Sequence, residues 1–158
     1  MTHSKTLIAL AVSLGGLLAA PAFAQTAAAP VATTVAPAAP AGLYQALGEK
    51  PGITRLVDDF VNRVVKDPRI GGHFKDTKPV ALKESLTDQI CQLSGGPCKY
   101  EGADMKSAHA DMDINKGHFN ALVEVLQSAM DAQGIPFAQQ NRLLALLAPM
   151  HRDVITKH

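Results

Sequence analysis

Four segments of this chain repeat apolar residues at spacings of three and four, and this periodicity restricts the chain to helices. Residues 53–66, 79–93, 116–132 and 138–156 each carry one apolar face, which is typical of a helix packed on one side. The alternating β-branched pattern of a half-buried strand is missing from the sequence. We therefore expect an all-α fold, and a length of 158 residues favours one domain.

A long polar connection separates the second and third of these helices. It covers residues 97–113, and loops of such length in compact domains are often functional. Met105 and His109 lie four residues apart within it, so a short helix over 105–109 would place both on one face. From spacing alone, His109 could be a metal ligand or an ordinary surface or core histidine.

The N-terminal part differs in composition from the rest. His3 and Lys5 precede an apolar run over residues 7–20, and Ala22-Phe23-Ala24 then gives the small-x-small pattern that signal peptidase reads. A membrane anchor needs about 20 apolar residues, so we expect no stable membrane span. We expect a signal peptide over 1–24, an Ala/Pro-rich linker over 25–41, a folded domain over 42–158 and a periplasmic location.

The chain has two cysteines, Cys91 and Cys98, on either side of a Gly-Gly-Pro turn. An oxidising compartment would allow them to pair. Covalent haem attachment needs C-x-x-C-H, which this spacing does not provide, and a zinc site needs more cysteine or histidine nearby. We therefore expect a disulfide.

The charges of the chain are nearly balanced. The 15 basic and 14 acidic residues leave a net charge of +1, and no basic block with interleaved aromatic residues occurs. The composition therefore gives no reason to expect nucleic acid as a partner.

Short motifs follow one another in a definite order through nearly the whole folded part. They include Leu43-Tyr44, Val57-Asp58-Asp59-Phe60, Gly95-Gly96-Pro97, Ala108-His109 and Arg152-Asp153-Val154. In this order and spacing, residues 43–155 resemble a group I truncated haemoglobin, the short bacterial, protozoan and algal branch of the globins. The resemblance implies a two-over-two helical sandwich around haem b (iron protoporphyrin IX).

The resemblance also assigns residues to the haem. His109 matches the proximal histidine that binds the iron, and His118, which also precedes a helix, is the rival. Phe74 matches the phenylalanine that stacks on the porphyrin. We expect further haem contacts from α-helical side chains on both walls, with Lys83 on a propionate: Leu82, Lys83, Leu86, Ile90, Met105 and Phe119.

The ligand side departs from the family pattern. Val61 stands where the family commonly has a tyrosine that hydrogen-bonds bound oxygen, and Leu82 and Leu86 are the other residues expected to face the ligand. Gln89 would enter this distal pocket only if its helix were rotated, and helix phase favours solvent for it. Ser85 stands where some relatives carry an iron-binding histidine.

His151 lies beside Arg-Asp-Val, where a histidine of the cyanobacterial branch bonds covalently to a haem vinyl group. The alternative is an ordinary surface histidine of the last helix.

The function implied is reversible binding of a diatomic gas: oxygen, nitric oxide or carbon monoxide. An enzyme for nitric oxide dioxygenation or peroxide chemistry is the alternative, and it would need a stabilised oxygen complex and an electron donor that the sequence does not identify. A haem-free helical interaction module is the third hypothesis. The sequence does not indicate an oligomeric state.

Overall fold

The computed structural model describes residues 39–157, which form helices and turns with no strand in that range. No helix among these residues is both long and apolar enough to cross a membrane. The expected signal peptide (1–24) lies outside the described residues, as do residues 25–38 of the expected linker.

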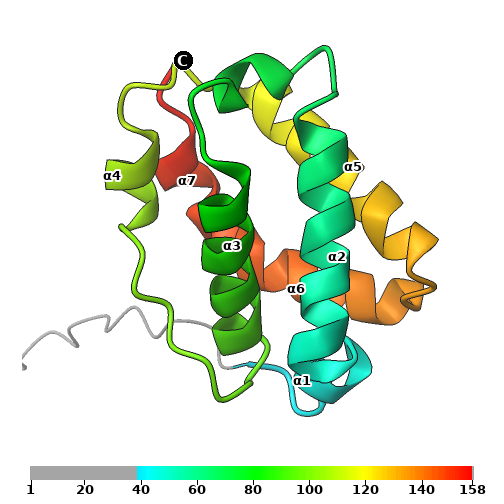
Figure 1. The fold of residues 1–158 in the computed structure, drawn as a ribbon. Helices are drawn as coiled ribbons and strands as arrows, with labels where there is room; N and C mark the ends of the chain where they lie inside the picture. The colour runs from blue at the N-terminus through cyan, green and yellow to red at the C-terminus, as the bar shows by residue number, and fades with distance from the viewer. Residues whose placement is uncertain (1–38, 158) are drawn as a thin grey trace, which may run out of the picture. The chain divides into compact units, whose positions relative to one another are not determined.

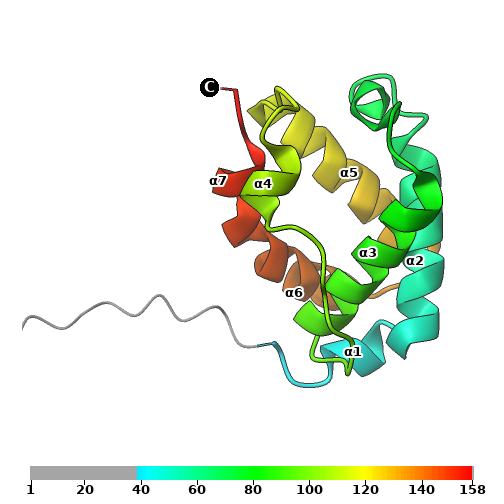
Figure 2. The ribbon, with the colours of Figure 1, turned by 60° about the vertical axis from the view of Figure 1, so that its left-hand side comes forward.

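Four helices form two layers (Figures 1 and 2). One layer pairs α2 (Glu49–Val64) with α3 (Pro79–Leu93), and these two run in opposite directions. The other layer contains α5 (Lys116–Ala132) and α6 (Phe137–Leu147), and α2 also packs against α5. The all-α, two-over-two architecture expected from the sequence is confirmed.

Short helical elements connect and complete these layers. They are α1 (Leu43–Ala46), η1 (Gly71–Phe74), α4 (Met105–His109), η2 (Ala148–Met150) and α7 (His151–Val154). The expectation of a short helix at 105–109 is confirmed. The expectation of one unbroken helix over 138–156 is wrong, because the chain tightens into a 3-10 turn at Pro149, which has no backbone N–H for helical bonding.

Helix ends follow local signals in the sequence. Pro79 opens α3, where a missing N–H costs nothing. Asn115 caps α5: its side chain accepts the His118 backbone N–H at 2.9 Å. The His118 ring in turn accepts the Asn115 backbone N–H at 3.4 Å, which completes a reciprocal cap.

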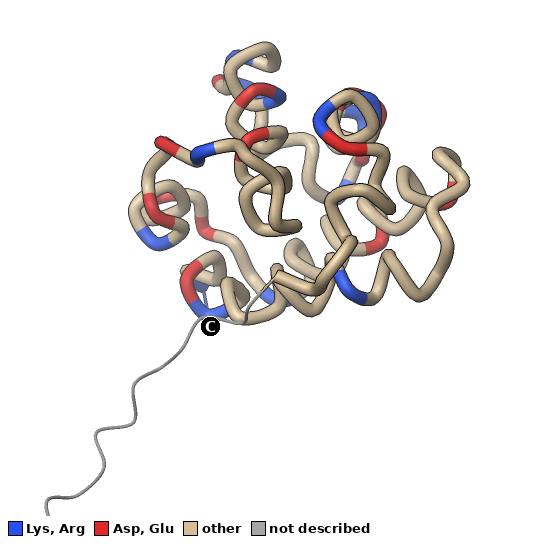
Figure 3. Tube along the Cα trace, turned by 90° about the horizontal axis from the view of Figure 1, so that it is seen from below, with Lys and Arg blue, Asp and Glu red and all other residues tan. Residues whose placement is uncertain are grey.

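The core lies between the layers and is organised around α2. Its buried members include one face of α2 and single faces of α5 and α6: Ile53, Leu56, Val57, Phe60, Val61, Val64, Ala121, Leu126, Met130, Leu143 and Leu146. Charged residues of both signs are interspersed along the helices and the connections between them (Figure 3). Because α3 and α5 both contribute residues to this core, the side chains that they carry toward the site described below are held by close packing.

Gly52 lies in the first turns of α2, against the residue that follows α1. It is buried, and a Cβ built on it would overlap the carbonyl oxygen of Leu47. Gly52→Ala should therefore destabilise the protein by about 1–3 kcal/mol, although alanine normally stabilises a helix relative to glycine. Gly72→Ala is the control, because nothing lies within 4 Å of its Cβ position. Denaturant unfolding of both variants tests this, and an unchanged or stabilised Gly52→Ala protein would contradict it.

Candidate functional site

Helix α4 carries the histidine singled out by the sequence, and a side-chain cap holds its first turn. Asp104 accepts the Ser107 backbone N–H at 2.9 Å and the Ser107 hydroxyl at 2.7 Å. These hydrogen bonds lower the pKa of the Asp104 carboxyl, so the capping residue stays ionised. The cap fixes where α4 begins.

The His109 ring is oriented by its own helix. Its Nδ1 lies 2.7 Å from the carbonyl oxygen of Met105. A carbonyl only accepts, so Nδ1 carries the proton and the lone pair of Nε2 stays free. The ring is half-buried. A neutral imidazole with its second nitrogen fixed to a backbone carbonyl is the usual state of a metal-binding histidine, so this donor fits an iron atom.

Several large apolar side chains of η1, α3 and α5 are only half-buried. Phe74, Leu82, Leu86 and Leu122 pack against the core but retain exposed surface, and Phe119 meets the ring of His151. Ile90, expected among the haem contacts, is instead almost fully buried in the core. Half-exposed apolar groups on η1, α3 and α5, together with one imidazole on α4, offer surface that a flat, apolar metal complex could cover.

Gln89 does not face solvent, so the helix-phase argument was wrong. Its side chain is only 8% exposed, and its Nε2 lies 3.5 Å from the sulfur of Met105 and 3.9 Å from that of Met150. The amide therefore reaches from α3 across to α4 and η2. A planar group lying between α3 and α4 has no room where these side chains touch, so we place Gln89 at the edge of the site and not above its centre.

The contacts of Lys83 do not support the predicted ion pair between its ammonium and a haem propionate. Its ammonium pairs with Asp58 of α2 at 3.0 Å. Lys83 is therefore engaged with the neighbouring helix of its own layer.

His151, the first residue of α7, packs against Phe119 of α5. Its ring is half-buried and meets the Phe119 ring edge to face, with centroids 4.7 Å apart. The structure therefore argues against the interpretation of His151 as an ordinary surface histidine.

His118, the rival to His109, has other partners. Its Nδ1 lies 3.1 Å from Nε2 of His73 in η1, and the same nitrogen accepts the backbone N–H of the helix cap. Because Nδ1 accepts, the proton between the rings belongs to His73. His118 thus links α5 to the turn that carries Phe74.

The predicted disulfide is present. Cys91 at the end of α3 is bonded to Cys98, with the two Cα atoms 5.7 Å apart. Cys91 is completely buried, so this bond joins the core to the segment that leads to α4.

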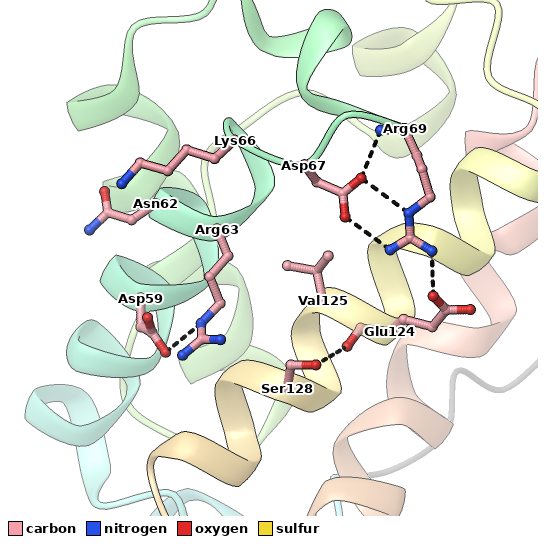
Figure 4. Close-up of a pocket in the computed structure, with 9 residues that line it drawn as sticks. All are labelled: Asp59, Asn62, Arg63, Lys66, Asp67, Arg69, Glu124, Val125 and Ser128. Atoms are coloured by element: carbon pink, nitrogen blue, oxygen red, sulfur yellow. Dashed lines mark hydrogen bonds and ion pairs between the residues drawn. The ribbon is translucent and has the colours of Figure 1, made fainter.

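A separate cleft of about 500 Å³ lies between α2 and α5 (Figure 4). Arg69 bonds both Asp67 and Glu124 there, and Arg63 pairs with Asp59 at 2.9 Å. The cleft contains no residue of α3 or α4 and is lined mainly by charged groups that neutralise one another. It is therefore unsuited to an apolar cofactor, and its ion pairs tie the turn after α2 to α5.

Comparison with known proteins assigns the family. The sequence profile of the bacterial-like globins matches residues 42–156. The group 1 truncated haemoglobin of Mycolicibacterium paratuberculosis is 30% identical over 119 residues, which cover 75% of this chain and 88% of that protein. The chain belongs to the group 1 truncated haemoglobins. The one from Synechocystis is 31% identical over 121 residues, covering 73% and 98%.

The architecture agrees with solved relatives. The crystal structure of truncated haemoglobin from Tetrahymena pyriformis in its Fe(III) form matches with a TM-score of 0.70 and 29% sequence identity. The match covers 73% of this chain and 98% of that one. This truncated haemoglobin is therefore a haem-binding globin, and the α4 site is the region where a haem ligand is expected.

Sequence reasoning missed two features of this truncated haemoglobin. Met150 lies at the edge of the site beside Gln89. In the sequence it continues the apolar spacing of the predicted helix 138–156, so it looked like a core residue. The His73–His118 pair spans 45 residues of sequence, and no local pattern indicates it.

The His73–His118 pair should make stability depend on pH. Burial, followed by the charge of His118, lowers the pKa of His73 below its ordinary value of 6.5, although the Met112 carbonyl and Asp113 oppose this. A histidine whose pKa is lowered on folding contributes stability above its unfolded pKa, and this stability is lost as the pH falls through the folded pKa. The thermal midpoint should therefore fall between pH 7.5 and pH 5.

The matched variant is His73→Gln, which keeps a donor for His118 but does not titrate. Its midpoint should fall less than that of the wild type over the same pH range. An equal fall in both proteins would show that this pair is not responsible.

Proposed function

We propose that this truncated haemoglobin holds one haem b with His109 on the iron and reversibly binds a diatomic gas on the opposite face. The observation that carries the proposal is the free Nε2 of His109, whose other ring nitrogen is fixed at 2.7 Å from the Met105 carbonyl. Haem would supply an iron able to bind oxygen, nitric oxide or carbon monoxide.

The residues around α4 would hold the porphyrin mainly through apolar contact. Phe74 comes from η1, Leu82 and Leu86 from α3, and Phe119 from α5, so the contacts converge from separate elements. Met105 and His151 complete the same surface. Covering these half-exposed groups removes apolar area from water, which stabilises the bound state by about 25 cal/mol per Å².

The ligand side offers few hydrogen-bond donors. Val61 is 1% exposed within the core face of α2, and Leu82 and Leu86 present only hydrocarbon. Oxygen bound to ferrous haem carries partial negative charge, and a charge-assisted hydrogen bond would stabilise it by about 1.5–3 kcal/mol. Without that bond, oxygen should leave quickly, which favours a gas binder over an enzyme that depends on a long-lived oxygen complex.

We also propose export to the periplasm. The bonded Cys91–Cys98 pair supports this, because disulfides persist in oxidising compartments. A reductant for the iron would then have to act outside the cytoplasm.

The proximal bond is tested by replacing each candidate histidine. His109→Ala should abolish stable haem uptake or leave a haem that only added imidazole retains, because it removes the imidazole that the Met105 carbonyl orients. His118→Ala should keep a five-coordinate ferrous optical spectrum. The reverse pattern would make His118 the ligand.

The polarity of the ligand side is tested at Val61. Val61→Tyr should slow oxygen dissociation by roughly tenfold or more relative to Val61→Phe, which adds the same ring without the hydroxyl. Carbon monoxide carries little charge when bound, so its dissociation should change much less. Stopped-flow measurements on both variants give the ratio.

Oxygen dissociation from the wild-type protein can contradict this account. Slow oxygen release that Gln89→Leu abolishes would show that Gln89, and not an apolar pocket, controls the ligand.

A further inference from the structure

The two walls of the haem site are joined by a stapled segment of chain. Helix α3 packs against α2, whereas α4 makes its main helix contact with α7. The covalent link between the helix of Leu82 and Leu86 and the helix of His109 is residues 94–104, which we call the strap.

The first half of the strap is fastened to the end of α3. The Gly96 N–H donates to the Cys91 carbonyl at 2.8 Å, and Cys98 is bonded to Cys91. The Tyr100 N–H then donates to the side-chain oxygen of Gln92 at 2.6 Å. These bonds hold the strap against α3, although it has already left the helix.

The second half has fewer attachments. The Tyr100 hydroxyl donates to the Ala103 carbonyl at 2.8 Å, which bends the strap on itself, and Asp104 caps α4 immediately afterwards. Besides the Gln89–Met105 contact and the packing of α4 on α7, the position of α4 relative to α3 therefore depends on where the fastened half ends.

We propose that the Cys91–Cys98 disulfide is a positioning device that holds His109 at a fixed distance from the α3 wall and thereby slows haem release. This rests on the proposed haem binding at His109. Neither cysteine needs to touch the haem; both act through the strap.

Chain length gives the size of the effect. Asp104 lies 11 residues after Leu93, the last residue of α3, but only 6 after Cys98, so the bond nearly halves the free chain between α3 and α4. The probability of holding two chain ends together falls as about the 3/2 power of the length, so losing the bond should loosen α4 by roughly two- to threefold.

The test uses haem-loaded protein and an excess of apomyoglobin as haem acceptor. The double variant Cys91→Ser/Cys98→Ser should release ferric haem roughly two- to threefold faster than the wild type. Its iron–histidine stretching band in the ferrous resonance Raman spectrum should also shift or broaden. The control is a core variant such as Ile53→Val, selected to lower the apoprotein melting temperature equally; it should keep the wild-type band and release rate.

Two insertions separate strap length from general stability. Gly-Ser inserted after Glu101 lengthens the free half and should speed haem release. The same pair inserted after Pro97 lies inside the ring that the disulfide closes, so it should leave release unchanged. If the serine variant does not fold, loaded wild type reduced by dithiothreitol, which converts the bond to two thiols, replaces it.

The outcomes separate the two proposals. A wild type that takes up no haem would overturn the proposed function. Haem release that is equal in wild type, reduced protein and both insertions, or equally fast in the core control, would overturn the positioning role while haem binding stands.

Discussion

Helix α4 is five residues long, and a helix this short cannot be stable alone, because helix nucleation costs more than so few backbone bonds return. The site depends on this constraint. Asp104 supplies the cap, the strap fixes the approach from α3, and α7 packs against the helix from the C-terminal end of the chain. The Ile114 carbonyl accepts the Thr156 N–H at 2.9 Å, which ties the exit of this region to α7. His109 is thus held by its surroundings more than by its own helix.

The helices were predictable because their signals are local. Apolar spacing acts within a few residues, and it predicted helices over 79–93 and 116–132, the bounds that the structure has for α3 and α5. The last helix was predicted as unbroken because its apolar spacing continues through Pro149. The α-helix ends there because Pro149 has no backbone N–H to donate, although the apolar spacing continues.

The site was predictable only in part, because its polar details depend on tertiary contacts. Local spacing could place Met105 and His109 on one face, and the family resemblance chose His109 over His118. Gln89 points inward because it contacts Met105 and Met150, which lie 16 and 61 residues away in the sequence. Lys83 pairs with Asp58 because α3 packs against α2. Sequence patterns carry little information about such pairs.

The central claim is that Nε2 of His109 binds haem iron while its Nδ1 stays bonded to the Met105 carbonyl. A crystal structure of the haem-loaded protein measures both at once. The account predicts iron bonded to His109, with Leu82 and Leu86 on the opposite face of the porphyrin. Iron bonded to His118 or to another side chain, or haem seated outside the α3–α4 site, would contradict it.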